Sequence, residues 1–259
     1  MIPGDSNIDE VNKMVERVTS ALDRIHILII GPGLGRNDFV LDATAKIIKQ
    51  ARRKGVSMVL DADALYLLSL PKYHYLIEEL SGELELSSSS GCRVVLTPNI
   101  VEYKRLVDHI ADGSEDKIHK LLPGVAIVKK GHCDTITCFS RGATDESASY
   151  TTMISEEKGG LKRSGGIGDI LAGCIGTFVA WNTILAKQQE GTASKENEIG
   201  ETASSGNDVN LVLSCWVACS ITKRATRLAF ENRKRSMTAP DILEELGGVV
   251  HEVASSTIR

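Results

Sequence analysis

Four short apolar runs recur along the chain at nearly even spacing, and they limit the fold more than any other feature. The runs are rich in Val, Ile and Leu and occupy residues 25–31, 57–63, 93–99 and 125–131. Their starts lie about 32 to 36 residues apart, close to the roughly 30 residues of a strand–helix–strand unit. Runs that are apolar throughout indicate parallel strands covered on both faces. We therefore predict an α/β fold with a mostly parallel central sheet and helices on both faces.

The ends of these predicted strands carry the residues that suggest chemistry. In parallel α/β sheets, ligands bind at the carboxyl ends of the strands. Here those ends read GPGLG (residues 31–35), DAD (61–63), TPN (97–99) and KKG (129–131). The third glycine of GPGLG comes one position too early for a dinucleotide-binding G-x-G-x-x-G, so a plain strand-to-helix turn explains it equally well. Of Asp61 and Asp63, we expect one to cap the next helix and the other to face a ligand.

Composition predicts one domain over residues 1–259. The chain is 42% hydrophobic with a formal net charge of −4, no block of Lys and Arg, and only 4% aromatic residues. This balance argues against binding of nucleic acid or of an anionic membrane surface. Residues 170–186 are apolar but short for a membrane span and interrupted by Asn182 and Thr183, so we expect a buried core helix there.

The cysteines and the N-terminal residues favour a reduced, cytoplasmic protein. The six cysteines form no CxxC pair and no Cys/His pattern suited to zinc. The first residues resemble neither a secretory signal nor a transit peptide. A longer form with a transit peptide would be directed to a plastid or mitochondrion. The sequence leaves a homo-oligomer open.

Two polar stretches are predicted to be surface insertions. They cover residues 79–91 and 187–208, and we expect the second to be disordered. Residues 209–230 are predicted to form a long, largely buried helix. Thr238 and Asp241 resemble a capping box for the last helix.

Two motifs have both a structural and a functional interpretation. In TPNIVEYKR, Asn99 and Glu102 fall three positions apart, on one face of the first turn of a helix. They are either a polar helix start with a favourable acid or a pair that positions Mg²⁺ through water. KKGHCD is either a hairpin turn or a loop that lays Lys130 and the backbone of Gly131 along a nucleotide. His132 alone is better explained as a loop residue than as a catalyst.

The segment KRSGGIGDILAG, residues 162–173, gives the strongest functional signal. It places Gly165, Gly166 and Gly168 where an apolar helix begins, although glycine weakens a helix by about 0.5–1 kcal/mol relative to alanine. Unpaired N–H groups and the helix dipole make such a start an anion site, and Lys162 and Arg163 fit phosphate. Asp169 is the one carboxylate in this segment able to accept a proton from an attacking hydroxyl. The chain has no G-x-x-x-x-G-K-[ST] motif, so a nucleotide must be bound by another scheme.

Taken in order, these motifs resemble those of the ATP-dependent (S)-NAD(P)H-hydrate dehydratases of the ribokinase-like superfamily. The resemblance rests on GPGLGR, VLDADAL, LTPNIVEYKRL, KKGHCD and KRSGGIGDILAG, and runs from about Ile25 to the end of the chain. The tail AFENRKRSMTAPDILEEL is most similar to the plant members. Thiazole and pyridoxal kinases share the GGxGD motif but lack the combination of GPGLGR, DAD and TPNxxE motifs.

The resemblance implies a repair enzyme for damaged nicotinamide nucleotides. Hydrated NADH and NADPH (NADHX and NADPHX) would be returned to NADH and NADPH at the expense of ATP, with Mg²⁺, by phosphorylation of the C6 hydroxyl and elimination of phosphate. The implied partners are the small molecules NADHX, NADPHX and ATP. A vitamin-like alcohol kinase of the same fold, whose product keeps its phosphate, and a truncated, non-catalytic ATP-binding protein are the alternatives.

The same resemblance assigns site residues. Asp169 would be the base, and backbone N–H groups around Gly166 and Gly168 would stabilise the moving phosphoryl group. Glu102 would orient a metal through water. The hydrate would contact Gly35, Asn99, Ile100, Val101, Glu102, Tyr103, Lys104, Arg105 and Asp169. ATP would contact Lys130, Gly131, His132, Cys133, Asp134, Gly159, Gly160, Leu161, Lys162, Arg163, Ser164, Gly165, Gly166, Ile167 and Gly168.

The chain departs from the family pattern at its start. Members of the family have a glycine-rich strand and helix upstream of GPGLG that contribute to the hydrate pocket, whereas only 30 residues precede Gly31 here. We therefore expect an N-terminally truncated chain without the first βα unit. Its ATP site would be intact, its edge strand exposed, and its hydrate turnover reduced.

Overall fold

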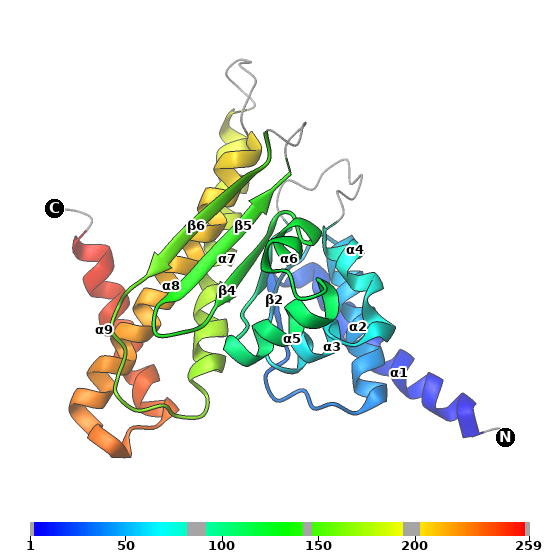
Figure 1. The fold of residues 1–259 in the computed structure, drawn as a ribbon, viewed down its shortest axis with the longest axis horizontal. Coiled ribbons are helices and arrows are strands. Elements are labelled where there is room, and N and C mark those ends of the chain that lie inside the picture. The colour runs from blue at the N-terminus through cyan, green and yellow to red at the C-terminus, as the bar shows by residue number, and fades with distance from the viewer. Residues whose placement is uncertain (1–2, 82–91, 142–146, 194–202, 257–259) are drawn as a thin grey trace.

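A six-stranded sheet with strand order β1-β2-β3-β4-β5-β6 forms the centre of the protein (Figure 1). The computed structural model describes residues 3–81, 92–141, 147–193 and 203–256. The strands are β1 (Ile27–Ile30), β2 (Ser57–Leu60), β3 (Val94–Leu96), β4 (Val125–Lys129), β5 (Asp134–Ser140) and β6 (Ser149–Ser155). β1 to β4 are parallel, and β5 and β6 are antiparallel to their neighbours. The mostly parallel sheet is confirmed.

The antiparallel strands β5 and β6 were not predicted. β5 pairs Lys129 with Thr135 across the KKGHCD turn, so this motif is a hairpin. The run Thr135-Ile136-Thr137-Cys138 alternates polar and apolar residues, and Ile136 and Cys138 are buried. Such alternation is the ordinary signal of a strand, and here it marks β5, which the search for continuous apolar runs overlooked.

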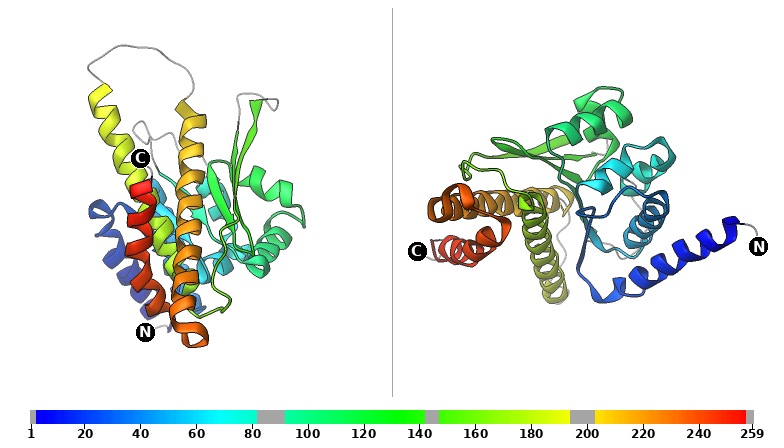
Figure 2. Two further views of the ribbon diagram at one scale, coloured as in Figure 1. Left: turned by 90° about the vertical axis from the view of Figure 1, so that its left-hand side faces the viewer. Right: turned by 90° about the horizontal axis from the view of Figure 1, so that it is seen from below.

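Helices cover both faces of the sheet, as predicted (Figure 2). The helices are α1 (Pro3–Thr19), α2 (Asp38–Arg53), α3 (Asp63–Leu68), α4 (Tyr75–Ser81), α5 (Ile100–Ile110), α6 (Glu115–Leu121), α7 (Ile167–Ala193), α8 (Ala203–Arg233) and α9 (Ala239–Ser256). Alternate strand residues point to opposite faces. Leu60, Leu96 and Ile127 therefore pack with α2 to α6, whereas Val59, Val95 and Val128 pack with α7 and α8.

The long helix α7 packs one apolar face against the sheet. Its Ile167–Ala186 stretch is long and apolar enough to cross a membrane, and 33% of it is buried inside the protein. Leu171, Ile175 and Val179 are buried against the sheet and α8. The predicted packing against the core holds for this face, whereas Trp181 and Leu185 are 51% and 57% exposed.

Both predicted insertions overlap the ends of helices. Leu80 is buried in the last turn of α4, so the first stretch begins as helix. The second contains the end of α7 and the start of α8, where buried Asp208 accepts a hydrogen bond from Ser140. Residues 82–91 and 194–202 lie outside the described residues, so the predicted disorder is untested there.

Three further expectations have clear outcomes. The long helix over 209–230 is confirmed with Leu211, Val212 and Cys215 buried, although Val209 is 43% exposed. Asp241 accepts hydrogen bonds from the backbone N–H (2.7 Å) and the hydroxyl (2.8 Å) of Thr238, which caps α9. All six cysteines are free thiols.

Candidate functional site

The four strand-end motifs lie side by side because the strands continue past their last sheet residues. Asp61 N–H donates to the carbonyl of Ile30 (3.0 Å), and Thr97 N–H donates to that of Leu60 (3.1 Å). Lys130 N–H donates to the carbonyl of Pro98 (2.8 Å). The parallel topology thus gathers GPGLG, DAD, TPN and KKG at one edge of the sheet.

The GPGLG turn is fixed by its contact with the DAD segment. Gly31 has φ +123°, and a Cβ there would lie 1.7 Å from the carbonyl oxygen of Asp61. The carboxylate of Asp63 accepts hydrogen bonds from Gly35 N–H (3.0 Å) and Arg36 Nε (2.8 Å). The expectation that one aspartate caps the following helix is wrong, since the N-cap of α3 is Ala62 and no side chain caps it. Both carboxylates bind other segments instead: Asp63 binds the GPGLGR turn, and Asp61 pairs with Lys130.

Tyr66 connects the GPGLG turn to α5. The guanidinium of Arg36 lies 4.2 Å from the centre of the Tyr66 ring and that of Arg105 lies 5.7 Å from it. Both distances suit a cation–π contact. The hydrogen bond that Arg36 donates to Asp63 raises the pKa of Arg36, and the charge of Glu102 adds to the effect. Tyr66, which no motif marked, thus links Arg36, the neighbour of Gly35, to Arg105; Gly35 and Arg105 are both predicted to contact the hydrate.

At the start of α5, Asn99 and Glu102 form a complete capping box. Asn99 Oδ1 accepts from the N–H groups of Val101 (2.9 Å) and Glu102 (3.0 Å), and Glu102 Oε2 accepts from Asn99 N–H (2.8 Å). Ile100 and Val101 are 62% and 68% exposed beside them. The structural interpretation of this pair is therefore correct, and one oxygen of Glu102 remains for a further role.

Tyr103 is buried, unlike the other residues of α5 that are predicted to contact the hydrate. Its side chain is buried, and its hydroxyl donates to Glu115 of α6 (3.4 Å). Burial raises the pKa of Tyr103 to about 12. Lys104 is exposed and Arg105 is half-buried. The residues of this helix turn that were predicted to contact the hydrate therefore do not all face the same surface.

The KKGHCD hairpin is held by its own aspartate and by a lysine from α8. Asp134 is buried, accepts a hydrogen bond from Gly131 N–H (2.9 Å) and pairs with Lys223 Nζ (3.1 Å). Lys223 also donates to the carbonyl of His132 (2.7 Å). His132 and Cys133 are exposed at the tip. The fixed turn thus depends on Lys223, which the sequence did not single out because it lies far along the chain.

In the glycine-rich segment before α7, the first glycines fit helix packing. A Cβ on Gly160 would lie 2.4 Å from the carbonyl oxygen of Thr226, and Gly160 N–H donates to the Thr226 hydroxyl (3.1 Å). Gly159 approaches the same threonine. Lys162 donates to the carbonyl of Met237 (2.6 Å), and its ammonium group thereby binds the segment that connects α8 to α9. Leu161 is 89% exposed, and Arg163 and Gly165 are exposed.

The last glycines shape the start of α7. Gly166 has φ +87°, and its carbonyl accepts the hydrogen bond of Ile170 (3.0 Å). The N–H groups before Ile170 have no carbonyl partner within a helix and carry its positive dipole end. A Cβ on Gly168 would lie 3.6 Å from Asp61 Oδ2 and 3.8 Å from Lys130 Nζ. Three motifs distant in sequence therefore meet at this helix end.

Asp169 lies at the same helix end with a free carboxylate. The residue is exposed, and its carboxylate makes no hydrogen bond or ion pair with any residue that the structure describes. An exposed carboxylate beside a helix N-terminus is compatible with the predicted role of Asp169 as a general base for a hydroxyl.

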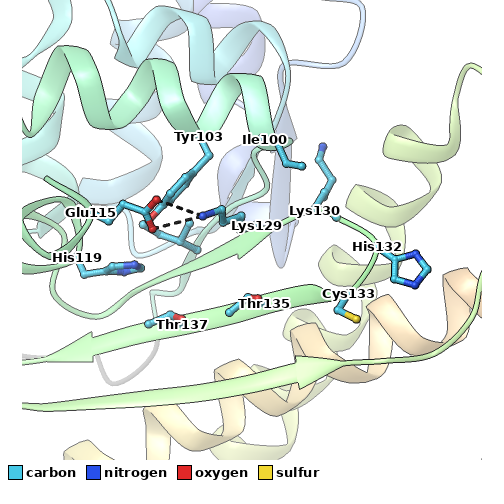
Figure 3. A pocket seen from close by; sticks show the side chains of 12 residues that line it. Ile100, Tyr103, Glu115, His119, Lys129, Lys130, His132, Cys133, Thr135 and Thr137 are labelled. Carbon is cyan, nitrogen blue, oxygen red and sulfur yellow. Dashed lines mark hydrogen bonds and ion pairs between the residues drawn. The ribbon is translucent and has the colours of Figure 1, made fainter. Parts of the chain in front are cut away.

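A cavity of about 330 Å³ lies between α5, α6 and the β4–β5 hairpin (Figure 3). Lys129 Nζ lies 3.3 Å from Glu115 Oε2 and 4.3 Å from the centre of the Tyr103 ring. Lys130 points away from this pair, as Figure 3 shows. The cavity is lined by Ile100, Tyr103, Glu115, His119, Ile127, Lys129, Lys130, Gly131, His132, Cys133, Thr135 and Thr137. It connects residues predicted for the hydrate with residues predicted for ATP.

His119 makes stability depend on pH. Its Nδ1 is buried with no partner among the described residues, and its ring lies 6.0 Å from that of Tyr150. Burial lowers the pKa of His119 from the usual 6.5, and Lys129 adds to this, against the opposing charges of Glu115 and Asp116.

The folded protein therefore binds fewer protons than the unfolded chain as the pH falls through 6.5, and the free energy of unfolding decreases. We expect urea unfolding at pH 7.5 and 5.5 to show a larger loss of stability for the unsubstituted chain than for His119→Gln. Equal losses in the two proteins would contradict this.

Comparison with known proteins agrees with the motif order. A family model described as NAD(P)H-hydrate dehydratase matches residues 6–247. The chain belongs to the NAD(P)H-hydrate dehydratase family. Relatives named ATP-dependent (S)-NAD(P)H-hydrate dehydratase include those of Phaeosphaeria nodorum (33% identical, 92% of this chain, 66% of the relative) and Neurospora crassa (34%, 91% and 62%). The Saccharomyces cerevisiae relative is 32% identical over 95% of this chain and 70% of its own.

Solved structures support the fold. A hydroxyethylthiazole kinase from Pyrococcus horikoshii matches 90% of this chain and 74% of its own with a TM-score of 0.55 and 16% identity. A protein from Streptococcus mutans matches 92% and 70% with a TM-score of 0.55 and 17% identity. The fold of this family member is thus ribokinase-like. The chain spans 66% and 62% of the length of the first two relatives.

Proposed function

We propose that this chain catalyses the ATP-dependent dehydration of the S-epimer of NADHX and NADPHX, a repair of nicotinamide nucleotides. One observation carries the proposal: the free carboxylate of Asp169 lies at the N-terminus of α7, where Gly168 approaches the Lys130 ammonium. This places a proton acceptor beside a site suited to a transferring phosphoryl group. Membership of the dehydratase family supplies the substrate class.

The proposed reaction has two steps. Asp169 accepts the proton of the C6 hydroxyl, whose oxygen forms a bond to the γ-phosphorus of ATP as the bond to ADP breaks. The C6–O bond then breaks with phosphate as the leaving group, and loss of a proton from C5 restores the C5–C6 double bond. N–H groups at the start of α7 stabilise charge on the phosphoryl oxygens during the first step. The products are NADH, ADP, phosphate and a proton.

Mg²⁺ is the proposed companion of ATP. Mg²⁺ is commonly held by one or two carboxylates together with phosphate oxygens and water. Among the described residues, no group of three or more His, Cys, Asp or Glu side chains is arranged to hold a metal, which fits an ion held mainly by the nucleotide. Glu102 suits this role because only its Oε2 is engaged, with Asn99 N–H.

Glu102→Gln separates the metal role from the capping role. Glutamine keeps an oxygen that accepts from Asn99 N–H, so the capping box survives, but the negative charge is lost. We expect the Mg²⁺ concentration for half-maximal rate to rise about tenfold, the cost of losing one charged contact of roughly 1.4 kcal/mol, with little change in hydrate affinity. An unchanged magnesium titration would leave Glu102 with the capping role alone.

A vitamin-like alcohol kinase remains the competing function, because it requires the same phosphoryl-transfer groups. The test is incubation of the chain with (S)-NADHX, Mg²⁺ and ATP, with NADH followed by absorbance. We expect NADH to form only when ATP is present. ATP binding without NADH formation would overturn the proposal.

A further inference from the structure

Asp61, Thr97 and Lys130 form a buried polar cluster below the start of α7. Each lies two positions after a strand residue that packs against α7 and α8, namely Val59, Val95 and Val128, so all three side chains emerge on that face. Asp61 is 2% exposed and Thr97 is 1% exposed. The Thr97 hydroxyl has no partner among the described residues.

The ion pair in this cluster is short and shielded from solvent. Lys130 Nζ lies 2.7 Å from Asp61 Oδ1, and the two side chains are 19% and 3% exposed. A buried carboxylate is costly unless it is paired, so Asp61 holds the ammonium group strongly. Without such a partner, a lysine side chain extends its charge into solvent.

The position of the ammonium group is unfavourable without an anion. It lies 3.8 Å from the place of a Cβ on Gly168, next to a helix end that is itself positive. Asp61 offsets this repulsion with only one of its oxygens. A phosphate oxygen entering here would meet an ammonium group and free N–H groups together.

The backbone on either side of Asp61 is tightly constrained. Its carbonyl is approached by Gly31 so closely that no side chain fits there. The next residue, Ala62, has φ +47° and ψ −113°, a strained conformation for a non-glycine residue. The orientation of Asp61 is thus set by the fold.

We infer that Asp61 is a positioning residue that holds the ammonium group of Lys130 at the N-terminus of α7 to receive a phosphate oxygen of ATP. The inference deepens the proposed function and rests on it for the identity of the nucleotide. Asp61 itself acts through Lys130.

A double-mutant cycle on ATP affinity tests this inference, with the dissociation constant measured by calorimetry on the whole chain. We expect Asp61→Asn and Lys130→Met each to weaken ATP binding about tenfold, as for a charged hydrogen bond of roughly 1.4 kcal/mol. The double variant should bind ATP no more weakly than Lys130→Met, because Asp61 has no effect once the ammonium group is gone. Glu252→Gln, which breaks the Arg224–Glu252 pair of 2.6 Å between α8 and α9, should leave the affinity unchanged.

Two results would overturn the inference: wild-type ATP affinity in Asp61→Asn, or a double variant much weaker than Lys130→Met. If Asp61→Asn does not fold, Asp61→Glu gives the same test, since it keeps the charge but displaces the ammonium group. It should weaken ATP binding while the chain stays folded, as a thermal unfolding transition verifies, and unchanged binding would contradict us. Because the readout is binding, failure of NADHX turnover alone would refute the proposed function and leave this result standing.

Discussion

Asp169→Asn should reduce the rate of NADH formation by about 10²–10⁴-fold, the range for loss of a general base. ATP affinity should stay nearly unchanged. The carboxylate contacts no described residue, and the N–H groups at the start of α7 do not depend on its charge. Asparagine has almost the same size, so the helix start is preserved. Steady-state rates and calorimetry with ATP measure the two effects separately.

Asp38→Asn is the matched control for this variant. Asp38 is also an exposed aspartate in the first turn of a helix, α2, and shares the favourable interaction of an acid with a helix N-terminus. Its substitution should leave the rate within about twofold of the original, as surface changes of less than 0.5 kcal/mol do. If Asp169→Asn kept half the rate, Asp169 would not be the base.

Gly31→Ala should lower the free energy of unfolding by about 2–6 kcal/mol. The new methyl group would lie 1.7 Å from the carbonyl oxygen of Asp61, so the backbone must move, which costs about 1–3 kcal/mol as overpacking. The conformation at φ +123° adds a further 1–3 kcal/mol or so of strain. Because Asp61 would shift with its carbonyl, ATP affinity should fall as well. Urea unfolding measures the first effect.

Gly33→Ala separates strain from collision in the same turn. Gly33 has φ +66°, and a Cβ there would meet nothing within 4 Å. Only the left-handed conformation is penalised, so we expect a loss of about 1 kcal/mol. Equal losses for the two variants would show that the approach of Gly31 to Asp61 has no energetic consequence.

The sequence predicted the parallel part of the sheet because parallel strands buried on both faces are apolar throughout. Their even spacing also placed the strand-end motifs at one edge. The β5–β6 hairpin was missed because its strands are not apolar throughout: β5 alternates polar and apolar residues from Thr135 to Cys138, and β6 reads SYTTMIS. A search for alternation would have found β5.

The roles of individual site residues were harder to predict, since they depend on partners distant in the chain. Nothing local indicates that Asp61 pairs with Lys130, 69 residues later. Lys223 and Thr226 act on the hairpin and the glycine-rich segment from a helix that the sequence marks only as apolar. By contrast, the capping role of Asn99 and Glu102 is a local property, and the sequence offered it as one of two interpretations.

The fate of the γ-phosphate tests the central claim most directly. The chain is incubated with (S)-NADHX, Mg²⁺ and ATP, and the products are followed by phosphorus NMR together with NADH absorbance. A dehydratase should release one free phosphate and one ADP for each NADH formed, with no accumulation of NADHX that carries the transferred phosphate. A stable phosphorylated product without NADH would identify a kinase and contradict the account.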